Sequence, residues 1–350
     1  MRRLLGPCAA LAVLLVPLRA SADYLVTDLG IFTASGINNA GQVVGSSPFV
    51  GGALLYSGGT FTNLGNFDPI GINSSGQVLG FYFGNDGIHG VLSSGGALTD
   101  LGSLGSGAPG GINDAGQVVG YSHTASGQHA FLYSGGVMKD LGTLGGASSA
   151  AYAINASGQV VGWSDTTGGG RHTFLYTGGV MKDLSLSTPG LGYGIPTAIN
   201  ASGQVVGYTT TATGDVHAFL YSGGKMTDLG TLGGQSSLAT GINASGQVVG
   251  FSDVVSPGGP YSPTGRHGFL YSSGKLIDLN DLLAPGSGIT LTGGSINDLG
   301  QIVASASNGH SYLLTPDGLT AFPEPGSLTL LGLGAVGLLV CRRRWAHFNR

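Results

Sequence analysis

The sequence predicts an all-β fold, and three observations lead to this conclusion. Glycine supplies 68 of the 350 residues, and the chain has one glutamate, Glu324, so long amphipathic helices are not expected. Apolar residues make up 41% of the chain and fall in short, regular runs, which disordered chains lack. One element, Gly-Ile-Asn-x-x-Gly-Gln-Val-Val-Gly with variations, occurs seven times, with its asparagine at Asn38, Asn73, Asn113, Asn155, Asn200, Asn243 and Asn297.

Each copy divides into four short predicted strands. The first strand ends at Ile-Asn, and Asn-x-x-Gly then forms a tight turn in which the glycine supplies a positive φ. The second strand is Gln-Val-Val-Gly and the residue after it. The third, His-Ala-Phe-Leu-Tyr, is intact at His129 and His217, and its unbroken apolar run suits a strand covered on both faces. Met-Lys-Asp-Leu-Gly or a variant of it forms the fourth.

Seven units of four strands predict a seven-bladed β-propeller over residues 23–321. The asparagines recur at intervals of 35 to 54 residues, and four strands in about 42 residues are typical of a propeller blade. A β-solenoid is the alternative architecture. It is disfavoured because solenoid coils are usually shorter and more uniform in length.

The chain contains one fourth-strand segment more than it has turn elements. Tyr24-Leu-Val-Thr-Asp-Leu-Gly30 matches the fourth strand at Lys225–Gly230, whereas the last copy has Ala321 where an aspartate is expected. An open ring would expose unpaired strand edges. We therefore expect the N-terminal segment to complete the last blade and to bring Asp28 to His310. The alternative is an extra strand on the first blade.

Residues 1–22 have the pattern of a secretory signal peptide. Arg2 and Arg3 precede an apolar run that extends to Leu18, and Ala20-Ser21-Ala22 offers signal peptidase a cleavage site after Ala22. A membrane anchor is the alternative. The run is shorter than the roughly 20 residues that a spanning helix needs.

Residues 322–350 contain a second targeting signal. Pro323-Glu324-Pro325 precedes an apolar segment, and Arg342 to Arg344 follow it, an order that stops transfer and leaves the basic cluster in the cytoplasm. This tail resembles the PEP-CTERM sorting tail, which exosortase recognises in Gram-negative bacteria. The resemblance implies export, a transmembrane helix that holds the protein at the inner membrane until processing, a final place in the cell envelope or on the extracellular surface, and a link to exopolysaccharide or biofilm. A plain tail anchor is the alternative.

The repeats themselves resemble the extracellular HAF repeats, a family named for the His-Ala-Phe found here at His129 and His217. The resemblance covers nearly all of the exported body, although the other copies depart from the motif at one position or more. It implies an extracellular repeat domain and brings no reaction, cofactor or ligand with it.

The composition of the exported body excludes several functions. Both cysteines, Cys8 and Cys341, lie in the predicted end segments, so the body has no disulfide. Between Asp23 and Ala321, six basic residues stand against sixteen aspartates. Such an acidic body argues against nucleic acid or anionic lipid as the ligand.

The histidines recur with the repeat. Six of the eight hold the same repeat position, and a residue needed in every unit has a structural role more often than a catalytic one. We expect each to be buried and hydrogen-bonded to the aspartate of the fourth strand. Catalysis or metal binding is the alternative, but His123 and His347 have no partners at metal-ligand spacing, and no metal or cofactor is predicted.

Aromatic residues are the candidate binding residues. An aromatic follows the glycine of Gln-Val-Val-Gly in five copies, at Phe81, Tyr121, Trp163, Tyr208 and Phe251. Packing between blades explains these positions, and the alternative is a set of platforms that stack on sugar rings. Tyr261, in the long segment 252–266, would add to such a site.

The sequence thus favours an exported, envelope-associated interaction or matrix module without enzymatic activity, with exopolysaccharide or envelope proteins as its partners. The alternative is a lyase or hydrolase that acts on extracellular glycan. That alternative requires a set of chemically competent residues confined to one blade, and none is evident in the sequence.

Overall fold

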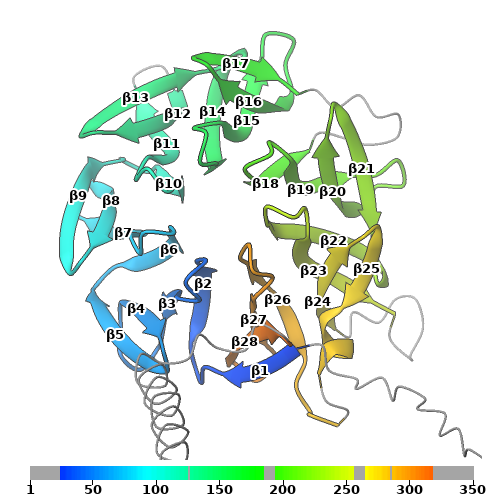
Figure 1. Ribbon diagram of the computed structural model, residues 1–350. Helices are drawn as coiled ribbons and strands as arrows, with labels where there is room; N and C mark the ends of the chain where they lie inside the picture. Colours follow the sequence, from blue (N-terminus) through cyan, green and yellow to red (C-terminus); the bar gives the residue numbers. More distant parts are fainter. Residues whose placement is uncertain (1–23, 125–126, 185–193, 256–264, 284–285, 318–350) are drawn as a thin grey trace, which may run out of the picture.

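The seven repeats form a closed ring of seven antiparallel four-stranded sheets, which confirms the predicted seven-bladed propeller (Figure 1). The computed structural model describes residues 24–124, 127–184, 194–255, 265–283 and 286–317. Blades 1 to 3 consist of β2 (Thr33–Ile37), β3 (Val43–Ser46), β4 (Ala53–Ser57), β5 (Thr60–Gly65); β6 (Asp68–Ile72), β7 (Val78–Gly84), β8 (Gly87–Ser94), β9 (Ala97–Ser103); and β10 (Ala108–Ile112), β11 (Val118–Thr124), β12 (Gly127–Ser134), β13 (Val137–Gly142).

The other four blades follow the same order around the ring. Blades 4 and 5 consist of β14 (Gly145–Ile154), β15 (Val160–Thr166), β16 (Arg171–Thr177), β17 (Val180–Asp183); and β18 (Ile195–Ile199), β19 (Val205–Thr210), β20 (Val216–Ser222), β21 (Lys225–Gly230). Blades 6 and 7 consist of β22 (Gly233–Ile242), β23 (Val248–Val254), β24 (Arg266–Ser272), β25 (Lys275–Asp278); and β26 (Leu291–Ile296), β27 (Ile302–Ala306), β28 (Ser311–Pro316), β1 (Tyr24–Asp28).

The turn between the first and second strands has the same geometry in every blade. In blade 1 the Gly41 N–H donates to the Asn38 carbonyl at 3.0 Å, and the Asn38 N–H donates to the Gln42 carbonyl at 3.0 Å. Gly41 has a φ of 72°, a conformation that favours glycine. All seven turns lie at one end of the ring, which we call the Asn-turn face. The second-to-third-strand connections lie at the opposite end, which we call the loop face.

The ring closes as the sequence predicts. β1 lies beside β28, in register with Val26 opposite Leu314 and Tyr24 opposite Pro316 (Figure 1). His310 Nδ1 lies 2.9 Å from Asp28 Oδ1, so the N-terminal strand supplies the aspartate that the last copy lacks. Because β1 begins where β28 ends, the described chain enters and leaves the ring at the Asn-turn face of blade 7.

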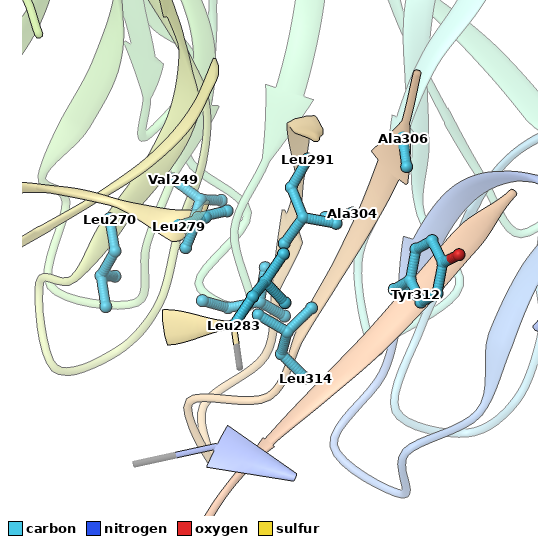
Figure 2. Close-up of a cluster of buried hydrophobic side chains, with 10 residues drawn as sticks. Val249, Leu270, Leu279, Leu283, Leu291, Ala304, Ala306, Tyr312 and Leu314 are labelled. Atoms are coloured by element: carbon cyan, nitrogen blue, oxygen red, sulfur yellow. The ribbon is translucent and has the colours of Figure 1, made fainter. Parts of the chain in front are cut away.

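The hydrophobic core is divided among the seven interfaces between neighbouring blades. Each cluster of buried side chains combines residues of two adjacent blades. Figure 2 shows the cluster between blades 6 and 7, where Leu279, Leu283, Leu291 and Leu314 gather. Burial of a leucine side chain contributes about 1.5–3 kcal/mol, so each interface holds its two blades together.

In blades 3, 4 and 6, the glycine of the second strand makes room for the phenylalanine of the third strand and for the backbone of the first. A Cβ placed on Gly162 would lie 2.8 Å from Phe174 Cε1, and the same approach recurs between Gly250 and Phe269. Phe174 and Phe269 are fully buried. The glycine of Gln-Val-Val-Gly therefore follows from core packing.

Several predictions concern residues outside the described part of the chain. These are the signal peptide over residues 1–22 with its cleavage site at Ala22, the tail over residues 322–350, and Tyr261. Within the described ranges, no helix has both the length and the apolar character that a bilayer crossing requires.

Candidate functional site

A ring of asparagines surrounds the axis at the Asn-turn face. The Asn38 Nδ2 donates to the Asn73 carbonyl of the next blade at 3.0 Å, and this bond recurs from blade to blade until Asn297 donates to the Asn38 carbonyl at 2.9 Å. Each asparagine also donates to the glutamine four residues later, as Asn38 does to Gln42 Oε1 at 2.8 Å. All seven asparagines are at least 95% buried, so this ring is part of the framework.

An axial channel runs inside this ring. The isoleucine that precedes each asparagine points toward the axis, and these seven isoleucines line two chambers of the channel. The chamber at the Asn-turn face has a volume of about 270 Å³ and is also lined by the residue that follows each asparagine. The chamber toward the loop face, of about 310 Å³, is lined by glycines of the first strands and by Tyr152 and Thr197.

Six histidines pair with the fourth-strand aspartate of their own blade, as the sequence predicts. The closest Nδ1–carboxylate distances are 2.6–3.1 Å, for the pairs His89–Asp100, His129–Asp140, His172–Asp183, His217–Asp228, His267–Asp278 and His310–Asp28. The expectation that these groups are buried is wrong. The histidine side chains are 14–30% exposed and the aspartates 19–51%, because the pairs lie where the third and fourth strands reach the loop face.

Blade 1 lacks both the histidine and the aspartate and keeps only the bond to the backbone that the aspartate makes elsewhere. In most blades the aspartate also accepts a bond from the N–H two residues later, as Asp228 does from Gly230 at 2.7 Å. In blade 1, Asn63 replaces the aspartate and still accepts from Gly65 N–H at 2.8 Å. Gly52 stands in the histidine position, where a Cβ would collide with the backbone of Gly65.

The five predicted aromatics occupy equivalent places in the second strands, but their surroundings differ. Trp163 is only 6% exposed, and the Arg171 guanidinium lies 3.5 Å from its ring centroid. Arg266 lies 4.4 Å from the Phe251 ring. Phe81 meets Phe83 edge-on, with their centroids 5.7 Å apart. Tyr121 and Tyr208 are half-buried.

Tyr152 connects one of these aromatic residues, Trp163, to the axial channel. This residue is the extra residue of a β-bulge in β14 and lines the chamber toward the loop face. Its hydroxyl accepts a hydrogen bond from Trp163 Nε1 at 2.8 Å. Burial raises the pKa of Tyr152, and the hydrogen bond from Trp163 partly offsets this rise. We call Tyr152, its partner Trp163, and the equivalent second-strand tyrosines of the two flanking blades, Tyr121 and Tyr208, the aromatic cluster.

Blade 2 carries an extended polar network around its histidine pair. Its tyrosine–aspartate bond has a counterpart in blade 7, where Tyr312 bonds to Asp28 and its ring stacks with that of His310. His89 Nε2 lies 2.7 Å from Asp86 Oδ1, and the Tyr82 hydroxyl donates to Asp100 Oδ2 at 2.8 Å. The hydrogen bond to Asp86, followed by that to Asp100, raises the pKa of His89. Burial alone would raise the pKa of Asp100, but bonds from Gly102 N–H, Tyr82 and His89 outweigh it and the pKa is lowered.

A serine–histidine pair lies at the same face, next to blade 2. Ser106 Oγ lies 2.9 Å from His123 Nδ1, and both residues are exposed. Ser106 belongs to the connection between β9 and β10, and His123 lies near the end of β11. Within the described residues, no group of three His, Cys, Asp or Glu side chains has the arrangement of a metal site.

The sequence analysis missed Tyr152, Asp86 and Ser106. Tyr152 stands one residue outside the regular strand pattern because of the bulge, so strand alternation did not place it at the channel. Asp86 and Ser106 lie in connections whose lengths vary between copies. Their departure from the repeat consensus was the one available signal.

Comparison with known proteins supports the sorting tail and the fold separately. The PEP-CTERM protein-sorting motif matches residues 323–344. This C-terminus is a PEP-CTERM sorting motif. The motif indicates export and sorting to the cell envelope, as the sequence predicts. No curated protein matches the chain.

Solved structures show the same fold at low sequence identity. A catalytically inactive variant of virginiamycin B lyase from Staphylococcus aureus, crystallised with quinupristin, is 12% identical with a TM-score of 0.54, and the match covers 83% of this chain and 99% of the lyase. The acylaminoacyl peptidase of Pyrococcus horikoshii is 12% identical with a TM-score of 0.52, covering 79% of this chain and 50% of the peptidase. The propeller domain of the Trilobed protease from Pyrococcus furiosus, described as having an open velcro topology, is 11% identical with a TM-score of 0.50, covering 73% of this chain and 85% of that domain. At these identities the likeness shows the fold alone.

Proposed function

We propose that this protein is a non-enzymatic interaction module of the Gram-negative cell envelope that binds exopolysaccharide. Exosortase would recognise the tail at Pro323, Glu324 and Pro325, and the apolar segment would hold the protein at the inner membrane until then. The resemblance of the repeats to HAF repeats stays a prediction and is consistent with this role.

The aromatic cluster of blades 3 to 5 is the observation that carries the proposal. Tyr152 lines the channel chamber of about 310 Å³, and the half-buried Tyr121 and Tyr208 occupy equivalent second-strand positions in blades 3 and 5, on either side of blade 4. Aromatic rings beside a cavity are suited to apolar sugar faces, while hydroxyl groups of the tyrosines can bond to sugar oxygens. Trp163 donates a hydrogen bond to Tyr152 and so helps to hold its ring in place. Its own ring is too buried to stack on a sugar.

The repeated polar groups support a role in binding over one in catalysis. The asparagines of the seven turns and the six paired histidines are engaged in contacts that recur around the ring. A group that holds the framework together in every blade is poorly placed to move protons during a reaction. The residues that vary between blades are the ones free to serve a ligand.

The test is binding of purified exopolysaccharide from the producing bacterium to the full chain. Tyr121→Ala and Tyr208→Ala should each weaken binding by about tenfold, equivalent to roughly 1.4 kcal/mol, because each removes a stacking surface. The matched control is Phe61→Ala, which removes a half-exposed ring from the outer strand of blade 1. Equal binding by all three variants and the wild type would refute the proposal.

A glycan-acting lyase or hydrolase is the second candidate, and the loop face of blades 2 and 3 favours it. Ser106 and His123 are within hydrogen-bond distance, and His89 contacts a second carboxylate, Asp86, in addition to Asp100. A serine beside a base has the first two parts of a nucleophilic site. Release of oligosaccharides by the wild type and its loss in Ser106→Ala, with binding intact, would establish this function instead.

A further inference from the structure

The Asn-turn face contains a second ring of hydrogen bonds, and this one is incomplete. In three places, the side chain after the asparagine accepts a bond from the equivalent backbone N–H of the preceding blade. Asp114 Oδ1 accepts from Ser74 N at 2.8 Å, Asp298 Oδ1 accepts from Ala244 N at 2.7 Å, and Asn39 Oδ1 accepts from Asp298 N at 2.9 Å. Three of the seven blades thus have a side-chain oxygen held on this backbone donor.

Three consecutive blades lack that oxygen. The residues that would provide it are Ala156, Ala201 and Ala244, which have no polar side-chain atom. The backbone N–H groups of Asp114, Ala156 and Ala201 consequently have no partner among the described residues. We call these three donors the open crescent.

The open crescent has the same geometry as the occupied positions. The asparagine bonds that fix one blade to the next measure 3.0 Å from Asn113 to Asn155, from Asn155 to Asn200 and from Asn200 to Asn243. The equivalent bonds beside the occupied positions are similar, at 3.0 Å from Asn73 to Asn113, 3.2 Å from Asn243 to Asn297 and 2.9 Å from Asn297 to Asn38. The three free donors therefore point to the place where Asp114 and Asp298 hold a carboxylate elsewhere.

The open crescent borders a cavity of suitable size. Asp114, Ala156, Ala201 and Ala244 all line the chamber of about 270 Å³ at the Asn-turn face. The alternative is that the three N–H groups donate to water. A ligand with oxygen acceptors would replace that water at little cost, because the donors are already fixed in direction by the turns.

Charge decides which acceptor fits. The carboxylates of Asp114 and Asp298 lie at the two ends of the open crescent, and the exported body is acidic overall. A second anion between them would be repelled. The neutral carboxamide oxygen of Asn39 occupies one equivalent position, and the acetamido group of a sugar has the same carbonyl. Sugar hydroxyls could then donate to the flanking carboxylates.

We propose that the open crescent is a binding site for an acetamido sugar, with its carbonyl oxygen on the backbone N–H of Ala156 or a neighbouring donor. This inference rests on the proposed glycan-binding function and names the sugar class. The site lies at the opposite end of the channel from the aromatic cluster, so the two can be disrupted separately.

Chitotriose and cellotriose test the acetamido group directly, since they share a backbone and differ in having an acetamido group or a hydroxyl at each ring. Titration calorimetry with the full chain should show chitotriose binding at least about tenfold tighter, as expected for one hydrogen bond of about 1.4 kcal/mol. Equal affinity for the two sugars, no binding of either, or a preference for trigalacturonate would each overturn the proposal.

Ala201→Asn tests the donor. The new carboxamide should bond to Ala156 N–H, as Asn39 does to Asp298, and thereby exclude the ligand. Chitotriose affinity should fall at least about tenfold while the melting temperature holds or rises. The control is Ser202→Asn, which puts the same side chain one residue further along the same exposed turn and should bind like wild type.

Separate outcomes distinguish this inference from the proposed function. If Ala201→Asn binds chitotriose like wild type, the open crescent is wrong whatever the exopolysaccharide result. If Tyr121→Ala and Tyr208→Ala bind exopolysaccharide normally but Ala201→Asn loses chitotriose, the aromatic cluster is wrong and the crescent stands.

Discussion

The two ends of the axial channel are built from the same seven repeats but differ in how far the repeats agree. At the Asn-turn face, every blade has the same buried asparagine, the same turn and the same bond to the next blade. At the loop face, the blades differ in loop length, in the residue that follows the glycine of the second strand and in the partners of the histidine.

The difference separates framework from function within one chain. A contact that recurs in all seven blades has little freedom to vary, because the ring must close and a displacement of one blade also displaces its neighbour. A loop that contacts solvent is free to vary. We therefore expect substitutions of the repeated asparagines at the Asn-turn face to lower stability, and substitutions of residues that differ between blades, at either face, to alter binding.

Opening the ring is the most severe way to test the framework. Deletion of residues 23–30 removes β1, leaves the edge of β28 unpaired and removes Leu29 from the core between blades 7 and 1. Domains have only about 5–15 kcal/mol of net stability, so we expect loss of cooperative unfolding, measured by circular dichroism on heating. The control is Leu25→Ser, at a 63% exposed position of the same strand, which should melt like wild type. A normal melt after the deletion would show that β1 is an appendage.

Removal of one asparagine from the ring should have the next largest effect. Asn155 donates to Gln159 Oε1 and to the Asn200 carbonyl, and it accepts from the N–H groups of Ser157 and Gln159. Asn155→Ala should cost about 2–4 kcal/mol in urea unfolding, since buried groups lose their partners. Thr167→Ala, in an exposed loop-face turn of the same blade, should cost under about 0.5 kcal/mol. Equal costs would contradict the contrast between the two faces.

The repeat made most of the framework predictable from the sequence. Blade number, strand order, the Asn-x-x-Gly turn and closure by β1 all follow from comparing one copy with the next. The bond from Asn155 to the next blade could not be predicted in this way. The sequence shows what repeats along the chain, but it does not show which atoms of neighbouring blades meet. The exposure of the histidine pairs was also missed, since their apolar neighbours Ala-Phe-Leu made burial the natural expectation.

The candidate sites were less predictable, because they arise where copies depart from one another. Tyr152 reaches the channel through a bulge, and the open crescent exists because three alanines follow their asparagines. No sequence motif predicts either feature. The positions of Trp163 and Phe251 were predictable, but their coverage by Arg171 and Arg266 depends on contacts between strands.

The paired histidines should contribute less than the asparagines, because their groups are partly exposed. His217→Ala should lower the free energy of unfolding by about 1 kcal/mol or less. Asp228→Ala should cost more than His217→Ala, since it also removes the acceptor for Gly230 N–H. Asp228→Asn should behave like blade 1, where Asn63 keeps this bond without a histidine. If His217→Ala lowers the free energy of unfolding in urea more than Asp228→Ala does, the histidine makes a stabilising contact beyond its pair with Asp228.

The smallest expected effect is the pH dependence that the network of blade 2 adds to the stability of the protein. The pKa of His89 is raised above 6.5, so the stability it contributes is fully present below pH 6.5 and is lost as the pH rises through the higher folded value. The pKa of Asp100 is lowered below 3.8, so its contribution is present above that pH and is lost as the pH falls through the lower folded value.

Both contributions are therefore present together between about pH 4 and 6.5. The melting temperature of His89→Gln should lie furthest below wild type in this window, and the two should converge as the pH rises above the raised pKa of His89. Asp86→Asn removes the largest cause of the raised pKa while keeping the contact to Asp100, so it should flatten the dependence without abolishing the pair. A difference between His89→Gln and wild type that stays constant with pH would show that His89 acts through packing on Tyr82, whose ring stacks 5.0 Å away, and not through charge.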